Sequence, residues 1–342
     1  MRNLPSAFLA IVVGTPAFAL PAISDPIMLG YFMPTSGVYG PNYFDPKFNK
    51  GYNAVVTAFI QIDCATDKKC LLRDQYGMMP EDIAKNVIVA KENGLKYAMA
   101  SFTWQGIPAD FNVGSSDDAH LSTIARTIIT YLKDAHLDGV DFDLEASLSL
   151  LPQGTWNGDT LHKLILELRK IKPEIIVTCA PQLSKNAQGK HILVTSGISQ
   201  DYDKAIELGD FDYIIVQAAL SLPEEANADI VANTYNWLTA SDAVVKIPQK
   251  TKLLIDVLSG PNVNQINSNT VWYNCKSCDD VYAKLAKSYE SISGESQFGG
   301  AATWSMNHDA NKSYGMEPEP SSDWKWVTTI LPAINGTIPK QD

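Results

Sequence analysis

The chain has 342 residues and carries a formal net charge of -11, with 38 acidic against 27 basic residues. Nucleic acids and anionic membranes attract clustered Lys and Arg, so this excess of acid argues against both as partners and favours a neutral substrate. The hydrophobic fraction of 45% excludes an intrinsically disordered chain and allows a sizeable core, in one α/β barrel or in two smaller domains.

The first 19 residues resemble a secretory signal peptide. Arg2 is followed by a mostly apolar run at 8–13 and then by Ala17-Phe18-Ala19, which matches an A-x-A cleavage site. The run is too short to span a bilayer. We expect residues 1–19 to be removed and residues 20–342 to form the secreted protein. The alternative is that this segment is a hydrophobic strand or helix of the fold.

Eight apolar runs of strand length alternate mainly with segments of helical spacing. The expected strands are 27–33, 54–62, 96–103, 138–145, 175–180, 213–219, 252–258 and 301–306. The expected helices are 80–93, 115–136, 159–171, 200–208, 223–245, 278–292 and 322–331. Parallel strands joined by helices, eight in number, predict a closed (β/α)8 TIM barrel of the α/β class, as a single domain over residues 20–342.

An open doubly wound sheet is the competing architecture. Its nucleotide-binding versions place a Gly-rich phosphate loop after the first strand. Here Gly30 is followed by Tyr31-Phe32-Met33-Pro34, so that loop is missing and the barrel is favoured. In a barrel the active site lies at the carboxyl ends of the strands.

The fourth expected strand, residues 138–145, reads DGVDFDLE. Apolar residues at 140, 142 and 144 alternate with Asp141, Asp143 and Glu145, which is the period of a β-strand with three carboxylates on one face. With the apolar face against the helices, the acids line the barrel interior. Crowded, partly desolvated carboxylates cannot all ionise, so this cluster suits general acid catalysis, with Glu145 nearest the mouth.

Three other interpretations of this strand are a solvated strand, a metal site and an ion-pair network. The alternation of strands and helices argues against the first. Gly139 precedes the second acidic position, unlike the glycine of an EF-hand, and the motif contains no histidine. It also contains no Lys or Arg. We therefore expect neither a metal site nor a cofactor, and favour a catalytic role.

The motif resembles the D-G-x-D-x-D-x-E signature of glycoside hydrolase family 18, which contains the chitinases and the endo-β-N-acetylglucosaminidases. Other strands are similar to those of the family at Gly30-Tyr31-Phe32, Ala58-Phe59, Ala180-Pro181-Gln182 and Ala302-Thr303-Trp304-Ser305. The resemblance covers nearly the whole mature chain, and the family fold is also a (β/α)8 barrel.

The resemblance implies retaining hydrolysis assisted by the substrate. Glu145 would protonate the glycosidic oxygen, while the 2-acetamido oxygen of the sugar attacks its own anomeric carbon. Asp143 would bind the acetamido N–H, and Asp141 would share a proton with Asp143. Asp138 and Gly139 belong to the structural part of the motif. The implied substrate-binding residues are Tyr31, Phe59, Trp104, Gln182, Gln217 and Trp304, although Trp304 can equally be a packing residue.

Two positions depart from the family pattern. The sixth strand usually carries a tyrosine two residues after a Gln or Met, but here Gln217 is followed by Ala218-Ala219. The third strand ends in Ser101-Phe102-Thr103-Trp104, where the family often has Ser-x-Gly-Gly. We expect a monomeric chitinase-like enzyme acting on chitin or oligosaccharides that contain N-acetylglucosamine. The alternatives are an endo-β-N-acetylglucosaminidase acting on N-glycans and a non-catalytic carbohydrate-binding barrel.

The five cysteines are compatible with an exported protein. Cys64 and Cys70 flank a short polar segment, Cys275 and Cys278 form a Cys-x-x-Cys, and Cys179 stands alone in an apolar run. Two local disulfides and one buried thiol are the simplest interpretation. A four-thiolate zinc site is the alternative, but it requires two distant segments to meet.

Overall fold

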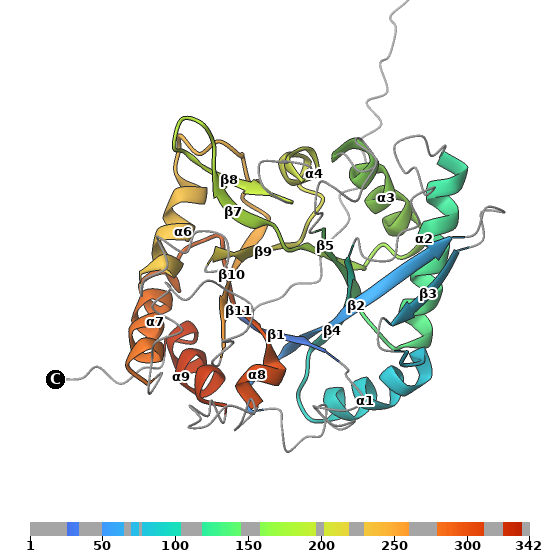
Figure 1. The fold of residues 1–342 in the computed structure, drawn as a ribbon, viewed down its shortest axis with the longest axis horizontal. Coiled ribbons are helices and arrows are strands. Elements are labelled where there is room, and N and C mark those ends of the chain that lie inside the picture. Colours follow the sequence, from blue (N-terminus) through green and yellow to red (C-terminus); the bar gives the residue numbers. More distant parts are fainter. Residues whose placement is uncertain are drawn as a thin grey trace, which may run out of the picture.

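A computed structural model describes residues 26–33, 50–64, 70–74, 77–103, 118–144, 158–195, 202–218, 229–259, 279–310 and 324–336. Eight parallel strands form a closed ring (Figure 1). They are β1 (Ile27–Phe32), β2 (Ala54–Cys64), β4 (Tyr97–Thr103), β5 (Gly139–Asp143), β6 (Ile176–Cys179), β9 (Tyr213–Gln217), β10 (Lys252–Leu258) and β11 (Phe298–Trp304). Pairing of β11 with β1 closes the ring, which confirms the predicted (β/α)8 barrel.

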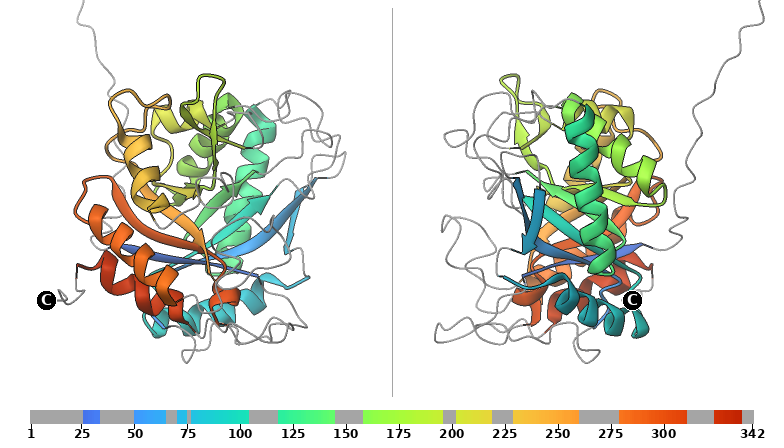
Figure 2. Two further views of the ribbon diagram at one scale, coloured as in Figure 1. Left: turned by 60° about the vertical axis from the view of Figure 1, so that its left-hand side comes forward. Right: turned by 90° about the vertical axis from the view of Figure 1, so that its right-hand side faces the viewer.

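Helices surround the strands on the outside of the ring, as the turned views in Figure 2 show. They are α1 (Pro80–Glu92), α2 (Asp118–Asp134), α3 (Gly158–Ile171), α4 (Asp203–Leu208), α6 (Ile230–Thr239), α7 (Asp279–Ile292), α8 (Met306–Ala310) and α9 (Lys325–Ile334). No helix in the described ranges is both long enough and apolar enough to cross a bilayer.

The strands bury both of their faces, and the two faces have different neighbours. The outward face packs against the helices in one large hydrophobic cluster, to which Val140, Phe142 and Leu144 belong. The inward face forms a smaller cluster inside the ring, with members such as Leu29 and Leu254. Because side chains alternate along a strand, Asp141 and Asp143 face the interior, as the sequence predicts.

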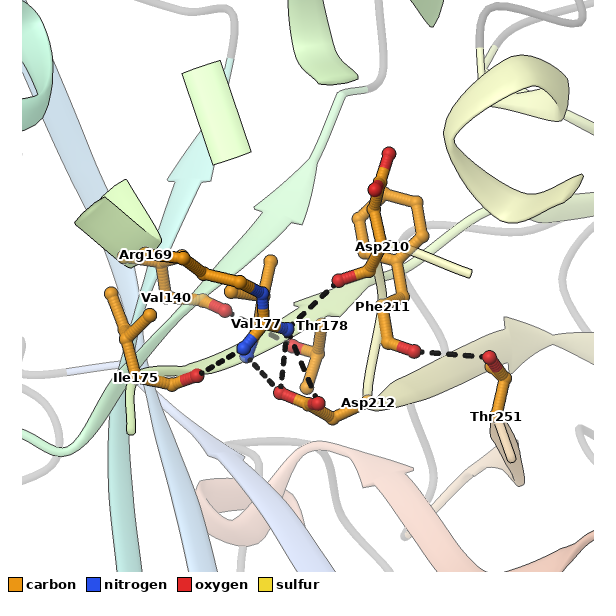
Figure 3. A network of polar contacts seen from close by, with 9 residues as sticks. All are labelled: Val140, Arg169, Ile175, Val177, Thr178, Asp210, Phe211, Asp212 and Thr251. Atoms are coloured by element: carbon orange, nitrogen blue, oxygen red, sulfur yellow. Dashed lines mark hydrogen bonds and ion pairs between the residues drawn. The ribbon is translucent and has the colours of Figure 1, made fainter. Parts of the chain in front are cut away.

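A buried ion pair fixes the strands at the end of the barrel where they begin (Figure 3). Arg169 at the end of α3 contacts both carboxylate oxygens of Asp212 at 3.2 Å and donates to the carbonyl oxygens of Ile175 and Asp210. Asp212 also accepts the backbone N–H of Val177 at 2.8 Å. The network thus joins α3, β6 and the segment leading into β9, and it sets the spacing of strands next to the carboxylate strand.

Three strands outside the ring were not predicted. β3 (Cys70–Asp74) pairs antiparallel with β2, and β7 (Gln182–Lys185) and β8 (His191–Val194) form a hairpin where the sequence indicated only a loop. Each is four or five residues long and mixes polar with apolar positions, so its periodicity is weak. Their stability comes from pairing with strands that are already in place.

Some predicted boundaries were also wrong. The helix predicted at 223–245 already ends at Thr239 in α6 (Ile230–Thr239), and β11 begins at Phe298 instead of residue 301 because Gly299 and Gly300 are weak strand formers. Gly300 has φ +136°, and a Cβ there would lie 1.9 Å from the carbonyl oxygen of Ile27, so only glycine lets these strands approach. The closing helix α9 continues through Pro332 to Ile334, three residues beyond the predicted end at residue 331.

Candidate active site

Asp141 lies at the centre of a buried hydrogen-bond cluster inside the barrel. The carboxylate is inaccessible to solvent and accepts three hydroxyl donors from three other strands. Thr178 donates to Oδ1 at 2.6 Å, while Ser101 and Tyr31 donate to Oδ2 at 2.8 Å and 3.1 Å. The donors hold the side chain in one orientation beside Asp143.

Burial raises the pKa of Asp141, and the three hydroxyl donors reduce that rise by stabilising the charged form. Burial is the largest cause, so the proton is bound more tightly in the folded protein than in the unfolded chain. A carboxyl of this kind can hold a proton at a pH where an exposed aspartate has lost it. That behaviour is what proton sharing with Asp143 requires.

Asp141→Asn is expected to make stability less dependent on pH, so that the difference from the native protein shifts in favour of the variant as pH rises. Because the folded pKa is raised, the contribution of Asp141 to stability is fully present below about pH 4 and is lost as pH rises through the folded pKa. The amide cannot ionise and escapes that loss. Thermal unfolding midpoints of both proteins from pH 4 to pH 8 test this. A difference that stays constant across the range contradicts the prediction.

Asp143 is held by the side chain of Gln217. The amide nitrogen of Gln217 donates to Oδ1 of Asp143 at 3.2 Å and to the carbonyl oxygen of Ala180 at 2.9 Å. Both side chains are almost completely buried, with exposed fractions of 5% and 4%. An amide N–H donor stabilises the charged form of a carboxylate without adding a cation to the site.

Tyr202 fixes the end of the carboxylate strand. Its hydroxyl donates to the carbonyl oxygen of Phe142 at 2.7 Å and accepts the backbone N–H of Leu144 at 2.8 Å. Tyr202 precedes α4 and is inaccessible to solvent. One hydroxyl therefore satisfies two backbone groups where β5 ends, immediately before Glu145. Burial raises the pKa of Tyr202, so the hydroxyl stays protonated and keeps both contacts.

Aromatic side chains form one wall of the interior. Trp304 stacks on Phe59 with ring centroids 5.5 Å apart and an interplanar angle of 18°, and it lies 5.7 Å from the ring of Tyr31. Tyr31 is buried, whereas Trp304 and Phe59 are half-buried. A stacked aromatic pair that keeps part of its surface accessible can receive the apolar face of a sugar ring.

The mouth ends of β1 and β11 are fixed by backbone contacts. The side chain of Asn307 pairs with Met33, accepting its N–H at 2.8 Å and donating to its carbonyl oxygen at 3.0 Å. The Ser259 hydroxyl donates to the carbonyl oxygen of Ser305 at 2.8 Å. These contacts hold the segments that carry Tyr31 and Trp304.

Asp138 and Gly139, the first two residues of the motif, position the start of β5. The Asp138 carboxylate accepts hydrogen bonds from the Lys91 ammonium group at 2.7 Å and from the backbone N–H of Ala98 at 2.9 Å. These contacts connect the start of β5 to α1 and β4. A Cβ at Gly139 would lie 2.2 Å from the carbonyl oxygen of Ile176, so a side chain would push β5 and β6 apart. Both residues thus set how β5 lies against its neighbours.

The structure brings together some of the predicted site residues and does not describe others. Asp141, Asp143, Tyr31, Phe59, Gln217 and Trp304 meet inside the barrel, and Gln182 begins β7 in register with Gln217. Glu145, Trp104, Cys275 and Cys278 lie outside the described residues. Tyr31 donates its single hydroxyl proton to Asp141, so its predicted part in substrate binding remains a prediction.

Sequence analysis missed four residues of this site. Ser101 and Thr178 donate to Asp141, Tyr202 holds the backbone at the end of β5, and Asp256 is the fourth. Asp256 is a buried acid on β10 whose charge acts on Tyr31. Its signal was a lone acid in the apolar run LLIDVL. Within the described ranges, no group of three or more His, Cys, Asp or Glu side chains is arranged to hold a metal ion.

The comparison with solved structures finds the same barrel fold in members of glycoside hydrolase family 18. A family 18 chitinase from Pseudoalteromonas aurantia aligns with a TM-score of 0.60 at 19% identity, covering 90% of this chain and 99% of that one. A family 18 chitinase from Chromobacterium violaceum gives 0.63 at 17% identity, covering 94% and 86%.

A fungal endo-β-N-acetylglucosaminidase of the same family aligns equally well, with a TM-score of 0.61 at 18% identity over 92% of this chain and 99% of that one. By sequence, no protein-family profile and no curated protein matches the chain. The shared architecture therefore rests on structure, and at these identities it establishes the fold alone.

Proposed function

We propose that this protein is a glycoside hydrolase that cleaves β-1,4 linkages of N-acetylglucosamine in chitin or chitin oligosaccharides. The observation that carries the proposal is the pair Asp141 and Asp143, turned into the barrel from the strand that leads directly to Glu145. Leu144 still packs in the outer cluster, so the alternation predicts an inward Glu145. The family 18 fold supports the same assignment.

The proposed reaction follows the substrate-assisted, retaining scheme. Glu145 protonates the glycosidic oxygen, the leaving sugar departs, and the acetamido oxygen of the retained sugar closes on its anomeric carbon. Asp143 accepts the acetamido N–H and stabilises the positive oxazolinium ion. Water then opens this ring, with Glu145 taking the proton, and the configuration at the anomeric carbon is retained. Asp141 and Gln217 hold Asp143 in place for both steps.

The acetamido oxygen lacks the tyrosine donor that the family usually places at position 219. Tyr31 is one described candidate to replace it, but its hydroxyl proton is already donated to Asp141. The loss of one such donor lowers rates by about 10²- to 10³-fold. We therefore expect turnover to be slow unless a residue outside the described ranges supplies the hydroxyl.

Release of reducing ends from an N-acetylglucosamine hexamer, measured for the native protein and for Glu145→Gln, tests the proposal. Turnover by the native protein and none by the variant supports it. Binding of the oligomer without turnover by either protein contradicts it, and would instead support a non-catalytic carbohydrate-binding barrel, which Ala219 favours.

A second candidate substrate is the chitobiose core of N-glycans, because one similar structure is an endo-β-N-acetylglucosaminidase. The chemistry is the same, since this core also contains a β-1,4 linkage between two N-acetylglucosamine residues. The two substrates differ in the sugars beyond the cleaved bond. A glycoprotein carrying one N-glycan, analysed by mass for loss of the glycan beyond its first sugar, distinguishes them.

We also propose that the protein is exported, with cleavage after Ala19, and that it acts as a monomer without nucleic acid or membrane partners. Residues 1–19 lie outside the described residues, so the support is the sequence alone. Sequencing the amino terminus of protein recovered from the growth medium tests the cleavage. A chain that begins at Met1 and stays in the cell contradicts it.

Unreduced, unfolded protein is expected to contain one free thiol, that of Cys179, which is buried. Cys64 and Cys70 are directly opposite each other in the antiparallel pair of β2 and β3. Opposite residues in such a pair have Cα atoms about 4.5 to 5.5 Å apart, within the range of a disulfide. Cys275 and Cys278 would form the second bridge. A titration that finds four or five free thiols contradicts the prediction.

A further inference from the structure

Asp256 is a buried acid in the barrel that the substrate-assisted scheme does not use. It is 3% exposed and lies two residues before the end of β10 at Leu258. Leu254, two residues earlier, belongs to the inner cluster, so the alternation of the strand turns Asp256 toward the interior as well. The acid therefore lies in the half of the barrel that carries the candidate active site.

The neighbours of Asp256 on the adjoining strands are Gln217 and Ala302. The register pairs Asp256 with Gln217 on β9 and with Ala302 on β11. Paired residues on neighbouring parallel strands project from the same face, with their backbones about 5 Å apart. Because Ala302 is apolar, the amide of Gln217 is the polar side chain in register with Asp256.

The hydrogen bonds of Gln217 fix which way its amide is turned. An amide NH2 has two hydrogens, and here one is donated to Asp143 and the other to the carbonyl oxygen of Ala180. The carbonyl oxygen of the same amide must point away from those two acceptors. A carboxylate can only accept hydrogen bonds, so it repels that oxygen, whereas a carboxylic acid can donate its O–H to it.

We propose that Asp256 is a positioning residue, held as a neutral carboxylic acid whose O–H donates to the side-chain carbonyl of Gln217. In the resulting chain of hydrogen bonds, Asp256 donates to Gln217 and Gln217 donates to Asp143. The first bond keeps the amide nitrogen of Gln217 directed at Asp143. Ionised Asp256 would instead attract the amide nitrogen and turn the amide over. Asp143 would then face a carbonyl oxygen, which repels its charge.

The electrostatic surroundings of Asp256 favour a proton there. Burial raises the pKa of Tyr31, and the charges of Asp141, Asp143 and Asp256 raise it further, which places three acids around one hydroxyl. Like charges so close cannot all ionise. Other described titratable groups on the adjoining elements are Tyr213 at the start of β9, Lys252 at the start of β10 and Tyr289 of α7. The Tyr289 hydroxyl donates to the carbonyl oxygen of Ile255, and Lys252 donates to the carbonyl oxygen of Ser296.

The test compares Asp256→Asn with Asp256→Leu in kcat and KM on the N-acetylglucosamine hexamer from pH 5 to pH 9. The effect on turnover rests on the proposed function. Asn donates through its NH2 as the acid does, so we expect its kcat to stay within a few-fold of native at neutral pH and to persist at alkaline pH where native activity falls. Leu removes the donor, and we expect a loss of about 10²-fold in kcat, with KM little changed. The exposed Asp242→Asn is the matched control.

Two outcomes of the kinetic test overturn the inference. If Asp256→Asn loses as much activity as Asp256→Leu, an ionised carboxylate is required. If Asp256→Leu keeps native activity, the amide of Gln217 is oriented without a hydrogen bond from Asp256.

Thermal midpoints over the same pH range give a readout that needs no turnover. Native stability should fall relative to Asp256→Asn as pH rises, because the folded protein holds the proton. A native protein without turnover would contradict the proposed function, and the midpoints alone would then decide the protonation of Asp256. If the difference between the two thermal midpoints does not change with pH, the inference that Asp256 is protonated is wrong.

Discussion

Asp143→Asn is expected to lower kcat on the N-acetylglucosamine hexamer by about 10²- to 10³-fold while the barrel remains folded. Asn has the same shape as Asp, and its carbonyl oxygen can still accept the amide N–H of Gln217, which lies 3.2 Å from Asp143 Oδ1. What the substitution removes is the negative charge. In the proposed mechanism that charge stabilises the oxazolinium ion, which exists only after the glycosidic bond breaks, so the loss should fall on kcat more than on KM.

Asp242→Asn is the control for this measurement. It makes the same chemical change on the surface, where Asp242 pairs with Lys190, and its kcat should equal that of the native protein. Circular dichroism and thermal unfolding of Asp143→Asn establish that the fold persists. A loss of kcat smaller than about tenfold would remove Asp143 from the mechanism.

The barrel could be predicted because each ring strand has a signal in its own local sequence. A buried strand in a parallel sheet is a short apolar run, and β10 has the predicted bounds, Lys252–Leu258. The orientation of β5 was predictable for the same reason, since Val140 and Asp141 differ in polarity and point to opposite faces. In contrast, the polar strand β7 depends on contacts with β8 and β9, which no local pattern encodes.

The partners of the acids could not be predicted in this way. Tyr202 is 58 residues from Leu144, and its own segment reads only as the start of a helix. Tyr31 and Asp141 are 110 residues apart and meet only because the barrel closes. Side chains that orient a catalytic strand come from strands across the ring, so their identity follows from register and closure and not from spacing along the chain.

Burial of the carboxylates limits what the site can contribute to stability. Burial raises the pKa of Asp141, which means that its charged form is less stable in the folded protein than in the unfolded chain. The outer cluster of apolar side chains and the ion pair of Arg169 lie away from the chemistry and compensate for this loss. Stability and the proposed activity therefore rest on different side chains of the same strands.

Arg169→Met is expected to lower the free energy of unfolding by about 3 to 5 kcal/mol, the largest effect on stability among these predictions. Met keeps the apolar stem of the side chain but removes the guanidinium that contacts Asp212 at 3.2 Å (Figure 3). Asp212 then keeps its backbone donor from Val177 and loses its buried cation. The carbonyl oxygens of Ile175 and Asp210 lose a donor as well. Urea unfolding monitored by tryptophan fluorescence measures the change.

Lys170→Met is the matched control, because it makes the same change at the next residue of α3, where the lysine is exposed and pairs with Glu167. An exposed pair of this kind contributes about 0 to 1 kcal/mol.

The loss in Arg169→Met should also depend on pH. Burial raises the pKa of Asp212, and the charge of Arg169 counteracts that rise. Without Arg169 the pKa rises further, so the variant should be most destabilised at alkaline pH, and the difference from native should shrink as pH falls and Asp212 takes up a proton. A loss equal to that of Lys170→Met, or one that does not change with pH, would show that the ion pair does not hold β6 and β9 together.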